Sequence, residues 1–217
     1  QVAWFQRVAL AAVADIEARG RRALLVGGTA LYVQAVVDRL DIPGRYPEAR
    51  AAVDAEPDTE LLHRRLQELD PVAAGRMEPS NRRRVLRALE VTEGSGRPFS
   101  SFGPGVSSHP PTTYRMVGLH RSADDLAGRI ERRYAEQLSA GFVDEVRALH
   151  RNPRGLSRTA AQALGYKELV DHVEGRATLD EAIDLAVRRT RRFARRQRAW
   201  FRRDPRTTWL DAETTPW

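Results

Sequence analysis

The residues best suited to bind a phosphate backbone gather near the C-terminal end of the chain. Nine of the sixteen residues from Arg188 to Arg203 are arginine, whose guanidinium group donates hydrogen bonds in a planar fork that fits phosphate oxygens. At helical spacing, this part of the sequence has one apolar stripe, made of Ile183, Ala186, Val187, Phe193, Ala194, Trp200 and Phe201. Thr190 and Gln197 fall on the same stripe. A buried hydroxyl or amide without a partner costs about 1–3 kcal/mol. Each therefore needs a partner, either a group of the protein core or a bound ligand.

A second arginine cluster lies in the segment SNRRRVLRALEV, residues 80–91. Its apolar residues recur at helical spacing and predict one buried face, whereas Arg83, Arg84 and Arg87 occupy the other faces near the start of the helix. Phosphate binding would explain these arginines, and so would an ordinary solvated helix surface.

The segment VGGT, residues 26–29, has the form of a turn that leads into a helix. Backbone N–H groups and the Thr29 hydroxyl at a positive helix N-terminus would form a seat for a phosphate or a substrate. Thr29 could equally be an N-cap that satisfies only its own helix. A P-loop requires a lysine directly after a glycine. The single lysine, Lys167, follows Tyr166, so these residues contain no P-loop.

The segment QALGYKEL, residues 162–169, places Gly165 inside a helical pattern that runs over 157–174. A glycine in a helix interior costs about 1 kcal/mol relative to alanine. We therefore expect something to approach the backbone closely at this point. A packed helix and a bound nucleotide both satisfy this expectation.

Composition narrows the class of protein. The net charge is +7 in 217 residues, and the basic excess is concentrated at 82–87 and 188–206. Such clusters are typical of a protein with a polyanionic partner, and a well-solvated helix face would explain them equally well. There is no cysteine, which excludes disulfides and thiolate chemistry and is compatible with a reducing cytoplasm. The histidines are scattered and indicate no metal site. No apolar run approaches the roughly 20 residues that span a bilayer, and no signal peptide is visible.

The predicted elements alternate in the manner of an open parallel α/β sheet. Helical spacing over 3–18 ends at Gly20, RALLVGG (22–28) is typical of a short buried strand, and the helical pattern resumes at Thr29. A second strand is predicted at 114–120. Between the strands lie short helices at 48–55, 59–69, 71–77 and 81–93, followed by a Gly/Pro/Ser-rich connector at 94–112. Further helices are predicted at 122–140, 142–151, 157–174 and 179–203. The opening residues already follow a helical pattern, so we expect the N-terminal part of a longer protein to be missing.

Five segments in register give the chain a specific resemblance. In order they are LLVGGTALYV, DPVAAGRMEPSNRRRVLRALEVTEGSGRPFS, GFVDEVRAL, QALGYKEL and TRRFARRQRAWFRR, and together they extend over nearly the whole chain. The chain thereby resembles the tRNA dimethylallyltransferase family, also called the tRNA isopentenyltransferase family.

The resemblance implies a transferase that moves a dimethylallyl group from dimethylallyl diphosphate to N6 of adenosine 37 in tRNA. The products would be N6-dimethylallyladenosine and diphosphate, with Mg²⁺ assisting departure of the diphosphate. The implied fold class is α/β and helix-rich, with a P-loop NTPase-like parallel sheet core, incomplete here, and a mostly helical insertion domain. The core would comprise 1–44 and 113–217, and the insertion, 45–112, would grip the anticodon stem-loop. The implied protein is a cytoplasmic monomer with no membrane segment.

The resemblance also implies which residues bind. Gly27, Gly28 and Thr29 would bind substrate, with Thr29 close to the reacting amine, and they would share one passage with Gln197 for a flipped adenine. The implied tRNA-contacting residues are Thr29, Arg50, Arg83, Arg84, Val85, Leu86, Arg87, Gln162, Ala163, Leu164, Gly165, Tyr166, Lys167, Arg195, Arg196, Gln197, Arg198, Ala199, Trp200, Phe201 and Arg202.

Two parts of the family pattern have no counterpart in these residues. The P-loop and the aspartate that acts as general base on N6 are both absent, so we expect this polypeptide by itself to be inactive. Two other classes of function remain alternatives. One is a non-catalytic RNA-binding module, and the other is a nucleotide kinase-like P-loop protein, which would have no use for two arginine clusters.

Overall fold

The computed structural model describes residues 2–157 and 159–214, which form two compact units. The first unit extends to Tyr114 and the second begins at Arg115. Both consist mainly of helices, and the second contains a small parallel sheet. The architecture is therefore helix-rich α/β, as predicted, while the predicted domain boundaries at 44 and 113 stay a prediction.

The first unit begins with two helices that pack against each other. Helix α1 spans Val2–Ala18 and ends before Gly20, whose φ of +67° suits a residue without a side chain. Helix α2 spans Ala30–Val37. The Gln6 amide of α1 donates hydrogen bonds to the carbonyl oxygens of Ala35 and Leu40, at 2.7 and 2.9 Å. The Ala35 carbonyl oxygen also accepts from the N–H of Leu40, so the Gln6 amide adds to the hydrogen bonds that close the C-terminal end of α2 and fixes α1 against it.

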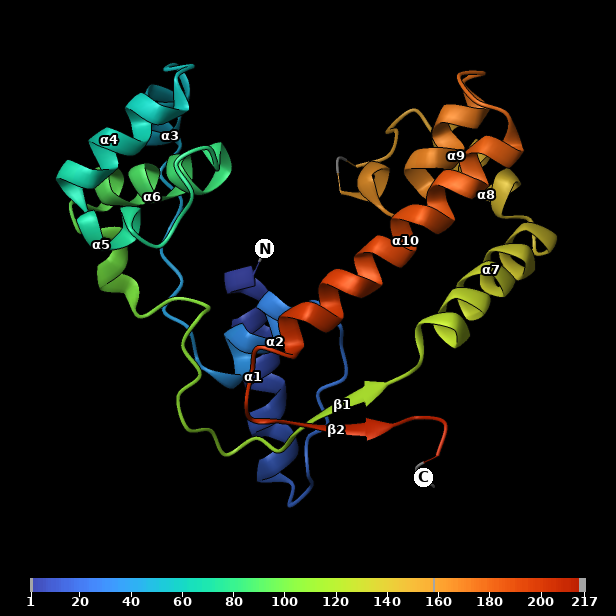
Figure 1. The fold of residues 1–217 in the computed structure, drawn as a ribbon, viewed down its shortest axis with the longest axis horizontal. Coiled ribbons are helices and arrows are strands. Elements are labelled where there is room, and N and C mark those ends of the chain that lie inside the picture. Colours follow the sequence, from blue (N-terminus) through green and yellow to red (C-terminus); the bar gives the residue numbers. More distant parts are fainter. Residues whose placement is uncertain (1, 158, 215–217) are drawn as a thin grey trace. The chain divides into compact units, whose positions relative to one another are not determined.

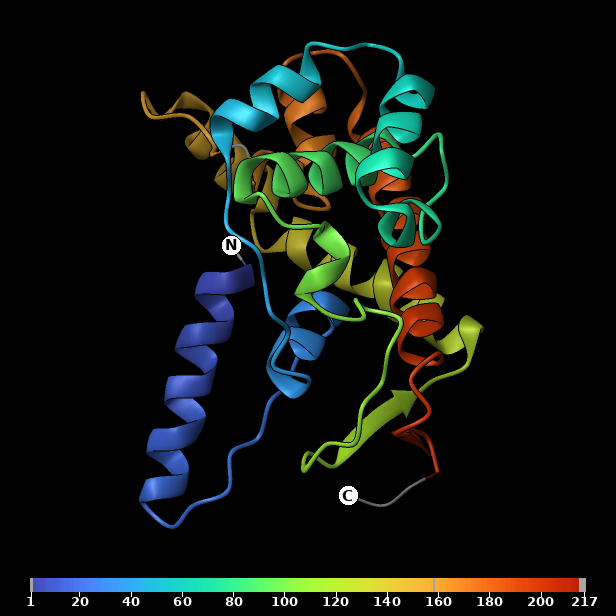
Figure 2. The same cartoon turned by 90° about the vertical axis from the view of Figure 1, so that its left-hand side faces the viewer.

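The predicted strand RALLVGG is wrong. Residues 21–29 form an extended connection without a strand, visible in Figure 2 as the thin coil between α1 and α2. Leu24 and Val26 are 86% and 82% exposed. A strand of a parallel sheet needs a neighbouring strand for its backbone groups and a layer that covers its apolar side chains. Nothing within the described residues supplies either to this segment.

The remainder of the first unit is a helical bundle. It consists of α3 (Pro47–Asp54), α4 (Thr59–Leu69), α5 (Pro71–Ala74), α6 (Arg82–Ser95) and the 3₁₀ turn η1 (Phe99–Phe102). Side-chain caps begin three of these helices at Asp58, Asp70 and Asn81. The core of the bundle is made of Val53, Leu62, Leu66, Ala74, Val85, Leu86, Ala88 and Leu89. The predicted helices at 48–55, 59–69 and 81–93 are confirmed, whereas the one predicted at 71–77 is shorter and ends at Ala74.

The second unit contains strands β1 (Met116–His120) and β2 (Thr207–Asp211), which pair in parallel from Met116 opposite Thr207 to His120 opposite Asp211. Figure 1 shows the two arrows side by side and pointing the same way. Strand β1 was predicted, whereas β2 was not, because the sequence around it lacks a long apolar run.

The helices of the second unit form its core. They are α7 (Ala123–Ser139), α8 (Phe142–Arg151), the 3₁₀ turn η2 (Ala160–Gln162), α9 (Tyr166–Val173) and α10 (Leu179–Phe201). Their buried residues form one cluster, made of Ile130, Tyr134, Phe142, Val146, Leu169, Ala182, Ala186 and Val187. Within the part of the chain that the structure describes, none of the helices has both the length and the apolar character that crossing a bilayer demands.

The single helix predicted over 157–174 is wrong. The chain turns at Ala163–Gly165, and α9 begins only at Tyr166, with Gly165 as its N-cap. Gly165 has a φ of +88°, which a residue with a side chain rarely adopts. The glycine that seemed to interrupt a helix therefore marks the point where the helix begins.

Candidate functional site

Ion pairing divides the arginines of α10 into two groups. In its N-terminal half, Arg188 pairs with Asp184, Arg189 with Glu168, and Arg191 with Glu131. The positive charges in this half are therefore balanced by carboxylates of the same unit. The first of these pairs lies within α10, and the other two connect it to α9 and α7.

The arginines that follow have no such partners. Within residues 2–157 and 159–214 none of them forms an ion pair, and all are exposed except the half-buried Arg198. Arg192, Arg195, Arg196 and Arg198 lie in α10, and Arg202 and Arg203 directly follow its last residue, Phe201. A dense row of uncompensated guanidinium groups on one helix attracts a polyanion, because binding a phosphate releases condensed counterions.

Thr190 has its partner inside the protein. The hydroxyl groups of Tyr134 in α7 and Thr190 lie 2.9 Å apart and form a hydrogen bond. Burial raises the pKa of the Tyr134 phenol, and the nearby carboxylate of Glu168 adds to the shift. The neutral phenol therefore holds α7 against α10. Of the two partners expected for Thr190, a group of the protein core and a bound ligand, the first is confirmed. Gln197 is half-buried in the second half of the helix.

The segment Gln162–Lys167 is fixed by the packing of aromatic rings. A Cβ atom on Gly165 would lie 3.1 Å from the Phe142 ring and 3.2 Å from the Tyr134 ring. The close approach predicted at this glycine is thus confirmed, and protein side chains make it. Gln162 and Lys167 are exposed, while Tyr166 donates a hydrogen bond to Glu145 at 2.6 Å, which raises the pKa of its phenol.

In the first unit, two of the predicted tRNA-binding arginines converge on a buried carboxylate. Arg87 donates to Oε1 of Glu90 at 2.6 Å and to the carbonyl oxygens of Pro43 and Gly44. Arg50 lies 3.9 Å from Oε2 of the same glutamate, which is 6% exposed. Arg87 therefore anchors the segment that enters the bundle, whatever else it binds.

The other members of this cluster differ in accessibility. The side chains of Val85 and Leu86 lie in the core, at 0% and 2% exposure, so any contact they make with RNA would have to involve the backbone. Arg83 and Arg84 are exposed, and among the described residues neither side chain has an ion-pair partner. These two arginines are the ones in this cluster that are available to phosphate.

The segment VGGT leaves the side chain of Thr29 accessible. Thr29 occupies the N-cap position of α2, yet its hydroxyl makes no capping hydrogen bond and the residue is exposed. A Cβ atom on Gly27 would meet only Val33, at an ordinary 3.9 Å. The described fold therefore gives no reason for a glycine at 27. Thr29 and Gln197 belong to different units, so the passage predicted between them stays a prediction.

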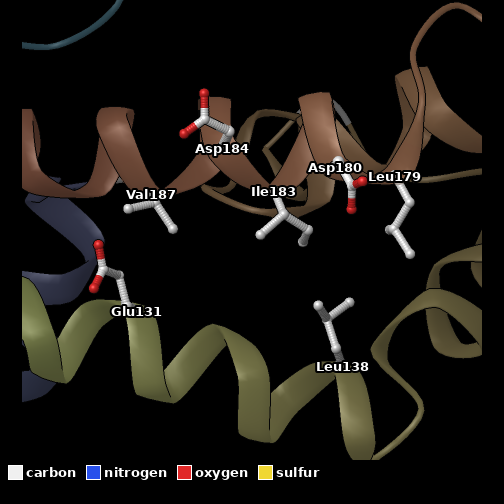
Figure 3. Close-up of a pocket in the computed structure, with 7 residues that line it drawn as sticks. All are labelled: Glu131, Leu138, Leu179, Asp180, Ile183, Asp184 and Val187. Atoms are coloured by element: carbon white, nitrogen blue, oxygen red, sulfur yellow. The ribbon is translucent and has the colours of Figure 1, made fainter.

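A pocket of about 280 Å³ lies between α7 and α10. Figure 3 shows Leu138 of α7 facing the apolar side chains of α10 across the opening, whereas the Asp184 carboxylate points away from it. The residues that line it are Glu131, Leu138, Leu179, Asp180, Ile183, Asp184 and Val187. The lining is mostly apolar and contains no basic residue to bind a diphosphate or a nucleic-acid backbone, so we do not assign the substrate to this pocket.

Two buried carboxylates that hold the predicted binding residues were missed by sequence reasoning. Glu90 and Glu168 each occupy a position that helical spacing assigns to the apolar face. A charged residue at a core position is the signal that could have found them, because such a residue requires a countercharge. Among the described residues no group of three potential metal ligands comes together, so we assign no magnesium ligands.

Comparisons with known proteins agree on one family. A family profile described as IPP transferase matches residues 1–204. The tRNA dimethylallyltransferase of Kineococcus radiotolerans is 48% identical over 98% of this chain and 67% of its own length. The crystal structure of the tRNA isopentenylpyrophosphate transferase of Bacillus halodurans matches with a TM-score of 0.64 and 37% identity, over 97% of this chain and 67% of that one.

A more distant crystal structure shows the same fold. A eukaryotic dimethylallyltransferase that acts on tRNA has a TM-score of 0.77 over 98% of this chain and 56% of its own, at 22% identity. The predicted fold class, helix-rich and P-loop-like, is thereby confirmed. The chain spans about two thirds of the length of the curated relatives that it matches.

Proposed function

Because the chain belongs to the IPP transferase family, we propose that its protein transfers a dimethylallyl group from dimethylallyl diphosphate to tRNA. The acceptor is N6 of adenosine 37, next to the anticodon. The observation that carries this proposal is the row of unpaired arginines in the second half of α10. Neither the RNA-binding module nor the nucleotide kinase is favoured by the family match.

The role proposed for α10 is to bind the phosphates of the anticodon stem-loop. Its free guanidinium groups supply forked donors, and Trp200, which is half-buried, offers an aromatic face for stacking. Lys167 and Gln162 are exposed next to the turn at Gly165 and extend the polar surface. Arg83 and Arg84 supply the equivalent charge in the first unit.

The role proposed for Gly27–Thr29 is to receive the reacting part of the substrate. The exposed hydroxyl of Thr29, which caps nothing, is free to bond with the acceptor base. A glycine at 27 permits the close approach of a ligand to the backbone. Transfer requires the amine and the allylic carbon to be held in line and the charge that develops on the diphosphate to be stabilised. The residues of this chain would perform the first of these tasks.

Magnesium belongs to the proposal as a consequence of family membership. A bound divalent ion would neutralise charge on the departing diphosphate. The residues described here contain no cluster that fits it, and we derive no step through the ion. We further propose that the protein acts in the cytoplasm as a monomer on one stem-loop. Light scattering of the protein with and without RNA would measure the oligomeric state.

The test uses the full-length protein that carries this chain, with labelled dimethylallyl diphosphate and an anticodon stem-loop. Label should pass to the loop that contains adenosine 37. A matched loop with guanosine at that position lacks the N6 amine and should receive none. Binding of the loop without transfer would support the RNA-binding module, and ATP turnover without RNA would support the kinase. Either result would refute the proposed transferase.

A further inference from the structure

A buried carboxylate lies between the two predicted RNA-binding segments of the second unit. Glu168, in α9, is 1% exposed. It directly follows the segment Gln162–Lys167, and α9 packs against α10. An ionised carboxylate removed from water requires a countercharge and hydrogen-bond donors. The proposed transfer reaction does not use this group, so its burial has another cause.

The two oxygens of Glu168 hold two different elements. Oε2 accepts a hydrogen bond from the backbone N–H of Gly165 at 2.8 Å, at the point where α9 begins. Oε1 accepts from Nη1 of Arg189, in the middle of α10. The Glu168 side chain therefore connects the turn at Ala163–Gly165 to α10.

The turn at Gly165 has little freedom to adjust. Its φ of +88° and the rings of Phe142 and Tyr134 define the direction in which the chain enters α9. The neighbour of Arg189, Thr190, is bonded to the same Tyr134. The ion pair between Glu168 and Arg189 connects α9 to α10, Thr190 connects α10 to Tyr134 of α7, and Tyr134 packs against Gly165 at the start of α9.

The position of Arg189 along α10 allows its ion pair with Glu168 to affect the direction of the arginines that follow. Arg189 lies one helical turn before Arg192, the first of the arginines without an ion-pair partner. If α10 rotated about its axis, the guanidinium groups from Arg192 onward would change direction relative to Gln162 and Lys167. The contact with Glu168 opposes that rotation.

We propose that Glu168 is a positioning residue for RNA binding. Its carboxylate holds the segment Gln162–Lys167 and the arginines from Arg192 to Arg203 in one fixed arrangement, so that both contact the same RNA together. This inference rests on the proposed function, because it takes the anticodon stem-loop as the ligand. Glu168 itself does not touch the RNA.

The experiment uses two variants of the full-length protein. Glu168→Gln keeps an acceptor for the N–H of Gly165 but places an amide beside Arg189. Glu168→Gln combined with Arg189→Met removes both charges, a change that leaves no unpaired buried ion and that many proteins tolerate. The control is Glu181→Gln, which alters an exposed capping box at the start of the same helix α10.

Both variants should bind the stem-loop about tenfold more weakly, the loss expected when one or two phosphate contacts are weakened. The slope of log Kd against log salt should fall by about one. The KM for tRNA should rise with the Kd, while kcat and the KM for dimethylallyl diphosphate stay within about twofold, which loss of structure would not produce. Amide hydrogen exchange over 162–167 should accelerate without RNA, and the control should match the wild type.

The outcomes separate the two proposals. A wild-type protein that does not bind the stem-loop would refute the proposed function. A wild type that binds, with folded variants of unchanged affinity and salt slope, would refute the positioning role alone. If Glu168→Gln binds normally and only the double variant is weakened, Arg189 contacts the RNA directly and the positioning role is wrong. Should Glu168→Gln fail to fold, the double variant decides by amide hydrogen exchange over 162–167: faster exchange supports the positioning role, and unchanged exchange refutes it, because a lower salt slope there could also come from loss of the Arg189 charge.

Discussion

The difference between paired and unpaired arginines of α10 can be tested by two matched double variants. In the first, Arg195 and Arg196, which are exposed and without ion-pair partners in the described structure, become glutamine. In the second, the change is made at Arg188 and Arg191, whose charges are balanced by Asp184 and Glu131. Both variants remove two positive charges from the same helix. They differ in whether those charges are compensated and in their place along α10, where Arg188 and Arg191 lie one to two turns before Arg195 and Arg196.

The expected magnitude follows from counterion release. Each phosphate contact contributes about 0.7–0.9 to the slope of log K against log salt, so loss of both contacts lowers the slope by about 1.4–1.8. The same relation gives about a twentyfold loss of affinity for the stem-loop at about 0.15 M salt. The control pair should change the slope by less than about 0.5, because its guanidinium groups are already engaged.

The assay is a fluorescence-anisotropy titration of a labelled anticodon stem-loop at four salt concentrations, with circular dichroism to confirm that both variants are folded. Equal loss of slope in the two variants would show that ion pairing does not decide which arginines bind. An unchanged slope in the first variant would show that this part of α10 does not contact phosphate, and the reasoning would fail.

Three further predictions concern stability and are measured by urea denaturation, with Gly128→Ala as the matched control for the first. Gly165→Ala should cost about 1–3 kcal/mol, because alanine disfavours φ +88° and its Cβ would press on two rings. Gly128→Ala, in α7 with open space around it, should be neutral or stabilising. Leu89→Ala, at 0% exposure in the bundle core, should cost about 2–5 kcal/mol. Tyr134→Phe should cost about 1 kcal/mol through the lost bond to Thr190. Because burial raises the pKa of Tyr134, its contribution is full below the unfolded pKa near 10 and is lost as the pH rises through the folded value. The variant should show a smaller alkaline loss than the wild type, the remainder coming from Tyr166, whose pKa is also raised, and equal alkaline losses in the two proteins would contradict the assignment.

Local patterns in the sequence were enough to predict most of the helices. The spacing of apolar residues that predicts helices at 59–69 and 81–93 is read from neighbours in the chain, and the structure has helices there. The resemblance of five ordered segments gave the family, which the comparisons confirm. Such features depend on residues a few positions apart, so the sequence alone determines them.

Other features depended on contacts between residues far apart in the chain. Leu24 and Val26 have the apolar pattern of a strand, but a strand also needs a partner, and the described fold provides none. Thr207–Asp211 lacks a strong strand pattern and becomes β2 because β1 pairs with it. Gly165 interrupts an apparent helix because two aromatic rings occupy the place of its side chain.

The same distinction applies to the candidate site. The sequence placed the arginines on one helix, because their spacing is local information. It could not show which of them are neutralised, since the carboxylates of Glu131 and Glu168 reach α10 from elements that are distant in sequence. Helical periodicity therefore determines where the positive charges lie along α10. Tertiary packing decides which of those charges remain available to a ligand.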